Sequence, residues 1–155
     1  ISECLVGSEM CIRDRYMESG PVIETPLSGA QCIHDMLLQS WGGKIRVFPA
    51  VPSQWKDVQF QDLRTEGAFL VSASREGGKT TGIRIKSLAG EPCILRTDMV
   101  NPIVKAGNVT LTPIGRGEYS LDLKKGESVV LTTAGDAIPV IGPVDGQGQN
   151  FFGLQ

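Results

Sequence analysis

The sequence has little of several residue classes. Only 6% of its 155 residues are aromatic, there is one histidine, and no run of about 18 apolar residues occurs. The missing apolar run predicts no membrane span, and a net charge of −2 argues against a protein dedicated to binding nucleic acid. Glycine and proline, by contrast, number 19 and 9, and this composition favours many short strands over a helical bundle.

The first fifteen residues do not have the pattern of a secretory signal, because acidic residues interrupt every apolar stretch. Residues 5–15 read LVGSEMCIRDR, and their back-translation resembles a sequencing-library transposase adapter. We therefore expect residues 1–15 to be a translated adapter and not native protein. The alternative is a short native amphipathic segment.

One helix is predicted over residues 26–41. Thr25 can cap it and Pro26 suits its first position, while Gly42 and Gly43 supply a left-handed stop. Its apolar residues recur at spacings of three, four and four, at Ala30, Ile33, Leu37 and Trp41. Met36 and Leu38 widen this stripe, so the helix needs partners on more than one side. A single small domain rarely provides them.

After residue 43 the apolar period falls to two, which is typical of strands. The clearest signal is a hairpin of residues 67–74 and 80–88, with Ile83 and Ile85 facing inward. The other predicted strands cover residues 44–47, 92–96, 108–112, 118–123 and 127–133. Regular spacing of this kind predicts a mainly β fold, an antiparallel β-sandwich over residues 44–135, followed by a Gly/Pro-rich tail over 136–155.

Few residues can carry catalytic or metal chemistry. Cys32 and Cys93 match no metal-ligand spacing, and each is more typical of a small buried side chain, although a disulfide between them stays open. His34 is more typical of a helix residue hydrogen-bonded to a neighbour than of a catalyst. No metal site and no cofactor is therefore expected.

Three further residues have two interpretations each. Trp41 and Trp55 are either stacking platforms for sugar rings or, as we favour, buried residues that fix the helix end and the proline-rich segment to the sandwich. Glu24 precedes the helix start in an apolar stretch, where a carboxylate is either a simple N-terminal cap or a partly desolvated functional group.

Several segments together resemble the C-terminal part of the α-L-fucosidase-like enzymes of glycoside hydrolase family 95. They are residues 23–29 (IETPLSG), 35–40 (DMLLQS), 45–52 (IRVFPAVP), Trp55 and 63–69 (LRTEGAF). The corresponding family text is similar to IDGNFGG, EMLLQS, a strand ending LPALP, a tryptophan and LRARGGF. The resemblance covers roughly residues 21–93.

This resemblance implies that residues 16–43 are the end of a catalytic (α/α)6 barrel, with the helix predicted over residues 26–41 as its last element. It also implies that the sandwich packs on the barrel. It also implies inverting hydrolysis of a glycosidic bond in a carbohydrate substrate, with Glu24 at the position of the family's water-activating aspartate. Glu24 is one methylene longer than aspartate, so fucose stays open as the sugar. The family's general acid lies upstream, and the isolated chain is therefore expected to be inactive.

A different class of function stays open. In that alternative the sandwich is a non-catalytic accessory domain that binds glycan or another domain, and Glu24 is only a helix-start carboxylate. The sequence does not settle the compartment, and a secreted or periplasmic parent protein is compatible with it.

Overall fold

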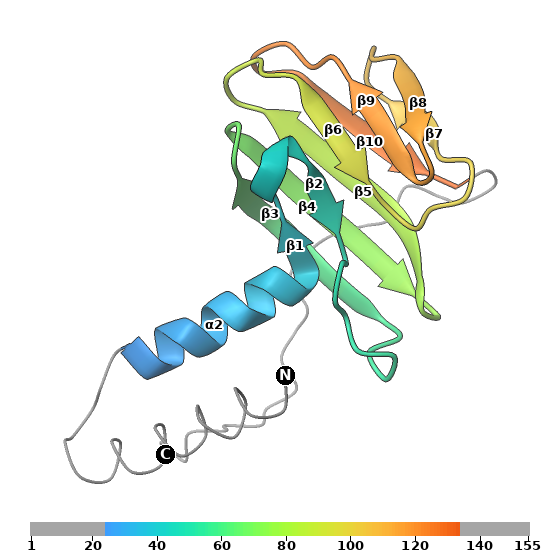
Figure 1. Cartoon of the computed structure of the whole chain (residues 1–155). Helices are drawn as coiled ribbons and strands as arrows, with labels where there is room; N and C mark the ends of the chain where they lie inside the picture. Colours follow the sequence, from blue (N-terminus) through green and yellow to red (C-terminus); the bar gives the residue numbers. More distant parts are fainter. Residues whose placement is uncertain (1–23, 134–155) are drawn as a thin grey trace, which may run out of the picture.

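A computed structural model describes residues 24–133, with side chains from Leu27 onward. The predictions for residues 1–15 and 136–155 lie outside the described residues. Helix α2 (Glu24–Leu37) leads into two five-stranded sheets that pack face to face (Figure 1). The predicted mainly β sandwich, preceded by one helix, is confirmed.

The first sheet contains, in spatial order, β1 (Leu38–Gln39), β2 (Ile45–Val47), β6 (Cys93–Arg96), β9 (Glu118–Leu121) and β8 (Leu111–Gly115). The second contains β3 (Val58–Thr65), β4 (Phe69–Glu76), β5 (Lys79–Ser87), β10 (Ser128–Thr132) and β7 (Ile103–Ala106). Neighbouring strands are antiparallel except β2 and β6, which run parallel. Their separation in the chain allows this, because a parallel pair needs a long connection.

The core lies between the two sheets. Ile83 and Ile85 are fully buried while Arg84 and Lys86 between and beside them face outward, as the alternation predicted. The other fully buried large side chains come from both sheets and from the segment after β9: Leu38, Val71, Leu95, Leu121, Leu123, Val129 and Leu131. Burying each such side chain contributes about 1.5–3 kcal/mol, so the sandwich has a core of its own.

The helix ends four residues earlier than predicted. It stops at Leu37, because Leu38 pairs with Val47 in the first sheet and is fully buried there as part of β1. Leu38 is therefore not an unpartnered flank of the helix, and that expectation was wrong. Gly42 and Gly43 do adopt positive φ, of 68° and 70°, but they turn the chain from β1 into β2.

Other differences concern strands with irregular pairing. Strand β3 was not predicted from the sequence. Its pairing with β4 shifts register between Phe60 and Leu63, at a bulge where Asp62 has φ 52°. The strand predicted over residues 108–112 begins only at Leu111, in β8, and β7 precedes it. Strand β8 is at the edge of its sheet, which is where proline residues such as Pro113 are tolerated in strands.

Candidate functional site

Glu24 is the first residue of α2, so it belongs to the first helical turn. At 1.5 Å per residue, the helix places its backbone about 20 Å from the start of the sandwich at Leu38. Figure 1 shows this end of α2 pointing away from both sheets. The Glu24 side chain is outside the described side chains. The strands of the sandwich therefore begin far from the backbone of Glu24.

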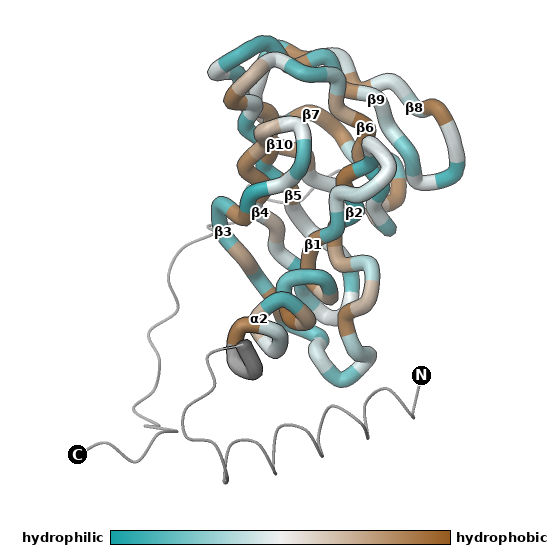
Figure 2. Tube along the Cα trace, turned by 60° about the vertical axis from the view of Figure 1, so that its left-hand side comes forward, coloured by the Kyte–Doolittle hydropathy of each residue, from teal (hydrophilic) through white to brown (hydrophobic). Residues whose placement is uncertain are grey.

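Helix α2 leaves apolar side chains in solvent. Leu27 is 60% exposed and Ile33 is 51% exposed, and Ala30 and Cys32 are also exposed. Figure 2 shows hydrophobic segments both within the sandwich and on α2, outside it. Amphipathic helices normally bury such residues against a neighbour. Among the described residues, no element covers this part of the helix.

The opposite end of α2 is joined firmly to the sandwich. The Phe48 amide donates to the Leu37 carbonyl at 2.8 Å, and the Ala50 amide donates to the Met36 carbonyl at 3.3 Å. These bonds satisfy carbonyls that a helix end otherwise leaves unpaired. Leu37 also packs against the core. The helix therefore projects from a fixed base.

His34 lies half-buried on α2, with Nδ1 3.8 Å from Oδ1 of Asp35. No hydrogen bond to Nδ1 occurs within the described part of the chain, so the predicted bond to a neighbour is not made at this atom. Across residues 24–133, no group of three His, Cys, Asp or Glu side chains is arranged to hold a metal ion.

The two described cysteines are separate. Cys93 is buried, as predicted, and burial raises the pKa of its thiol to about 12. Cys32 is exposed on the helix, contrary to the prediction, and both thiols are free. No disulfide therefore joins the helix to the sandwich.

Trp41 sits at the junction of helix and sandwich and is 63% exposed. Its indole N–H donates to Oε1 of Gln39 at 3.2 Å, and the Arg46 guanidinium lies 3.9 Å from its ring centroid. Arg46 also donates to the Trp41 carbonyl at 2.7 Å. The interpretation of Trp41 as a buried fixing residue was wrong, because an arginine rather than the core holds the ring.

Trp55 is 42% exposed, so it is not a buried fixing residue either. It lines a groove of about 920 Å³ with polar neighbours that include Asp57 and Glu76. Two hydrogen bonds join the β4–β5 turn to the segment before β3 beside this groove. The Gly77 amide donates to Asp57 at 2.8 Å, and the Gly78 amide donates to the Lys56 carbonyl at 2.9 Å. An exposed aromatic ring beside polar groups is able to stack a sugar ring.

Residues 39–131 match the family model described as glycoside hydrolase family 95, C-terminal domain. The matched range is more than half of the chain. The chain belongs to glycoside hydrolase family 95. The match to this family begins two residues after α2 ends and stops within β10, so it coincides with the sandwich. No curated protein matches the chain.

The family 95 chain has no membrane-spanning helix among its described residues, since α2 has 14 residues and a span needs about 20.

The sequence predicts the family and the apolar character of α2. The sequence does not predict the stacking of Arg46 on Trp41, because no local pattern indicates a cation–π contact between a turn and a strand.

Proposed function

We propose that this chain is the C-terminal end of an inverting, α-L-fucosidase-like glycoside hydrolase. In this proposal, α2 is the last helix of a catalytic (α/α)6 barrel, and the β-sandwich that begins with β1 at Leu38 supports that barrel. The observation that carries the proposal is α2 itself: a helix with Leu27 and Ile33 in solvent, directly ahead of a sandwich of family 95. Other barrel helices would cover that apolar surface.

Glu24 acts in this proposal as the carboxylate that activates water. An inverting glycosidase uses two carboxyl groups about 6.5–9.5 Å apart, one to protonate the leaving oxygen and one to take a proton from water on the opposite face of the sugar. Water attacks the anomeric carbon as the glycosidic C–O bond breaks, and the leaving group departs as an alcohol. Glu24 supplies the base, and the barrel supplies the acid.

The placement of Glu24 in the first turn of α2 supports this role. The positive end of the helix dipole favours the charged form of a carboxylate, which is the form a base needs. Its distance of about 20 Å from the sandwich supports a reaction in the barrel rather than in the β-domain. The sandwich then fixes the last barrel helix through the hydrogen bonds at Leu37 and Met36.

The test uses the complete enzyme. Glu24→Gln should lower kcat for an α-L-fucoside or a related glycoside by at least about a hundredfold, in line with loss of a general base. The matched control is Glu91→Gln, which alters the same side chain in an exposed loop of the sandwich. An unchanged kcat in Glu24→Gln with intact stability would refute the catalytic role.

A second candidate function is glycan binding by the sandwich itself, and the exposed ring of Trp55 over its groove favours it. In this case, the chain binds a neutral oligosaccharide saturably, and Trp55→Ala weakens binding. Trp41→Ala is the control, because Arg46 already occupies one face of that ring. Calorimetry that shows no heat with any glycan would count against this candidate.

A further inference from the structure

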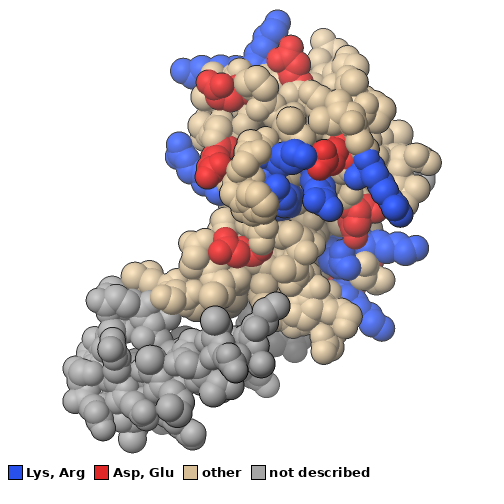
Figure 3. Space-filling model, in the orientation of Figure 1, with Lys and Arg blue, Asp and Glu red and all other residues tan. Residues whose placement is uncertain are grey.

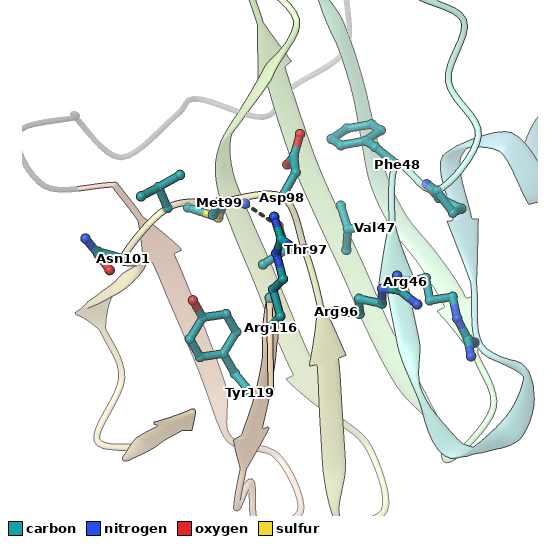
Figure 4. Close-up of a pocket in the computed structure, with 13 residues that line it drawn as sticks. Arg46, Val47, Phe48, Arg96, Thr97, Asp98, Met99, Asn101, Arg116 and Tyr119 are labelled. Carbon is teal, nitrogen blue, oxygen red and sulfur yellow. Dashed lines mark hydrogen bonds between the residues drawn. The ribbon is translucent and has the colours of Figure 1, made fainter. Parts of the chain in front are cut away.

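A cavity of about 740 Å³ lies at the end of the first sheet where β2 and β6 finish (Figure 4). Three arginines from three elements line it: Arg46 in β2, Arg96 in β6 and Arg116 in the turn between β8 and β9. The volume falls within the range of about 300–1,000 Å³ that is typical of small-ligand pockets.

Two of these arginines lie directly beside each other across the sheet. Arg46 and Arg96 are Cα partners in the parallel β2–β6 pair. Their neighbours Ile45 and Leu95 are buried, so both arginines belong to the outer face. Figure 3 shows several basic side chains on this face, with acidic side chains among them. Glu118 is the Cα partner of Arg96 on its other side, so this face also carries an acidic group, and a bound anion would add a further partner for the arginines.

The third arginine is held near the cavity by a close backbone approach. The Thr97 amide donates to the Gly117 carbonyl at 3.0 Å, which fixes the β8–β9 turn against the end of β6. Gly117 has φ 70°, and a Cβ there would lie 2.7 Å from the Thr97 carbonyl oxygen. The turn that carries Arg116 therefore reaches this position only with glycine beside it.

The carboxylates nearby already have other partners. Lys44 donates to both oxygens of Glu118, at 2.9 and 3.0 Å, and Arg75 donates to Asp98 at 3.0 Å. The hydrogen bonds from Lys44 hold the pKa of Glu118 below its ordinary value, and the nearby positive charges of Lys44, Arg96 and Arg46 lower it further, against an opposing effect of desolvation. Glu118 is therefore an anion at neutral pH, and its carboxylate is already paired with Lys44.

The three arginines differ in whether their hydrogen-bond donors already have acceptors in the protein. Arg46 is committed to the carbonyls of Trp41 and Lys44, at 2.7 and 3.2 Å. Arg96 and Arg116 make no hydrogen bond or ion pair within residues 24–133. Both side chains are exposed, and the charge of Arg96 also acts on Glu118, so two guanidinium groups line the cavity with donors open to a ligand.

We propose that this cavity binds an oxyanion carried by a saccharide, either a uronate carboxylate or a sulfate ester. Guanidinium groups pair with such oxyanions through parallel hydrogen bonds. Figure 4 shows Tyr119 and Asn101 on one side of Arg116 and Arg96 on the other, so polar groups for sugar hydroxyls adjoin the cationic groups. The saccharide part of this proposal rests on the proposed function, whereas the oxyanion part does not.

The experiment is calorimetric titration of the full chain with trigalacturonate, with a sulfated trigalactose and with unmodified trigalactose. At least one anionic trisaccharide should bind more tightly than the neutral one, with an affinity that falls as ionic strength rises. Replacing both unpaired arginines, Arg96→Gln with Arg116→Gln, should weaken binding by about tenfold or more. Arg64→Gln, on the exposed side of β3, is the control and should have no effect.

The outcomes separate this proposal from the proposed function. Glu24→Gln and Trp55→Ala should leave binding of the anionic trisaccharide unchanged, whatever they do to hydrolysis or to neutral glycans. Equal binding of all three trisaccharides, or of none, would overturn the proposal. Inorganic sulfate that binds as tightly as either anionic trisaccharide would overturn its saccharide part. The single Arg116→Gln change, on an exposed turn, serves if the double variant does not fold.

Discussion

Replacing Ile33 and Leu38 separately by alanine compares two residues five positions apart on either side of the helix–sandwich boundary. Leu38 is fully buried in the core, whereas Ile33 is 51% exposed on α2. Removing the Leu38 side chain should cost about 3 kcal/mol or more, because the lost transfer free energy adds to that of a cavity. The Tm and the urea midpoint should fall together.

Ile33 should behave differently. Its side chain loses roughly three methylene-sized groups in the change to alanine, worth about 0.8 kcal/mol each when buried, and half of that surface is already in water. The better helix propensity of alanine offsets part of the remainder, so the net cost should be below about 1 kcal/mol. Urea denaturation followed by circular dichroism of the strands provides the free energies of unfolding. A cost at Ile33 equal to that at Leu38 would refute the account of α2 as a helix without a partner.

The remaining predictions concern backbone strain, acid stability and thiol reactivity. Gly107→Ala should lower the free energy of unfolding by about 2 kcal/mol or more, because φ is 106° and a Cβ would lie 2.5 Å from the carbonyl oxygen at the start of β10; thermal unfolding checks this. The pKa of Glu118 is lowered, so its pairing with Lys44 stabilises the fold fully above the ordinary glutamate pKa, and this contribution is lost as pH falls through the folded-state pKa. Glu118→Gln should therefore flatten part of the acid-side decline in Tm, and an unaltered pH profile would contradict this. Iodoacetamide at pH 8 should label Cys32 but not Cys93 in the native chain, because a pKa of about 12 leaves only about one Cys93 thiol in ten thousand ionised; peptide mass mapping distinguishes the two.

The regular part of the fold was predictable from local pattern. The β4–β5 hairpin has clean alternation on both strands and two glycines at its turn, so the sequence signal and the tertiary structure agree. The helix end was not predictable in this way. Its apolar spacing continues to Trp41, but the helix ends at Leu37 because Leu38 pairs with Val47 in the first sheet. Tertiary contacts often override local propensity in this manner.

The arginine cavity depends on pairings that no local pattern contains. Arg46 and Arg96 are 50 positions apart in the chain and meet only through the parallel β2–β6 register. Arg116 joins them because a glycine lets its turn approach β6 closely. Candidate sites of this kind follow from non-local sheet topology, whereas Glu24 was proposed from a contiguous motif.

Helix α2 needs a partner that the sandwich does not provide, and amide hydrogen exchange of the chain, read by mass spectrometry, measures this. Amides in the first three turns of α2 should exchange through local opening with little protection, while β4, β5 and β10 should exchange only near the global free energy of unfolding. Protection of α2 equal to that of β5 would show that the sandwich alone stabilises the helix.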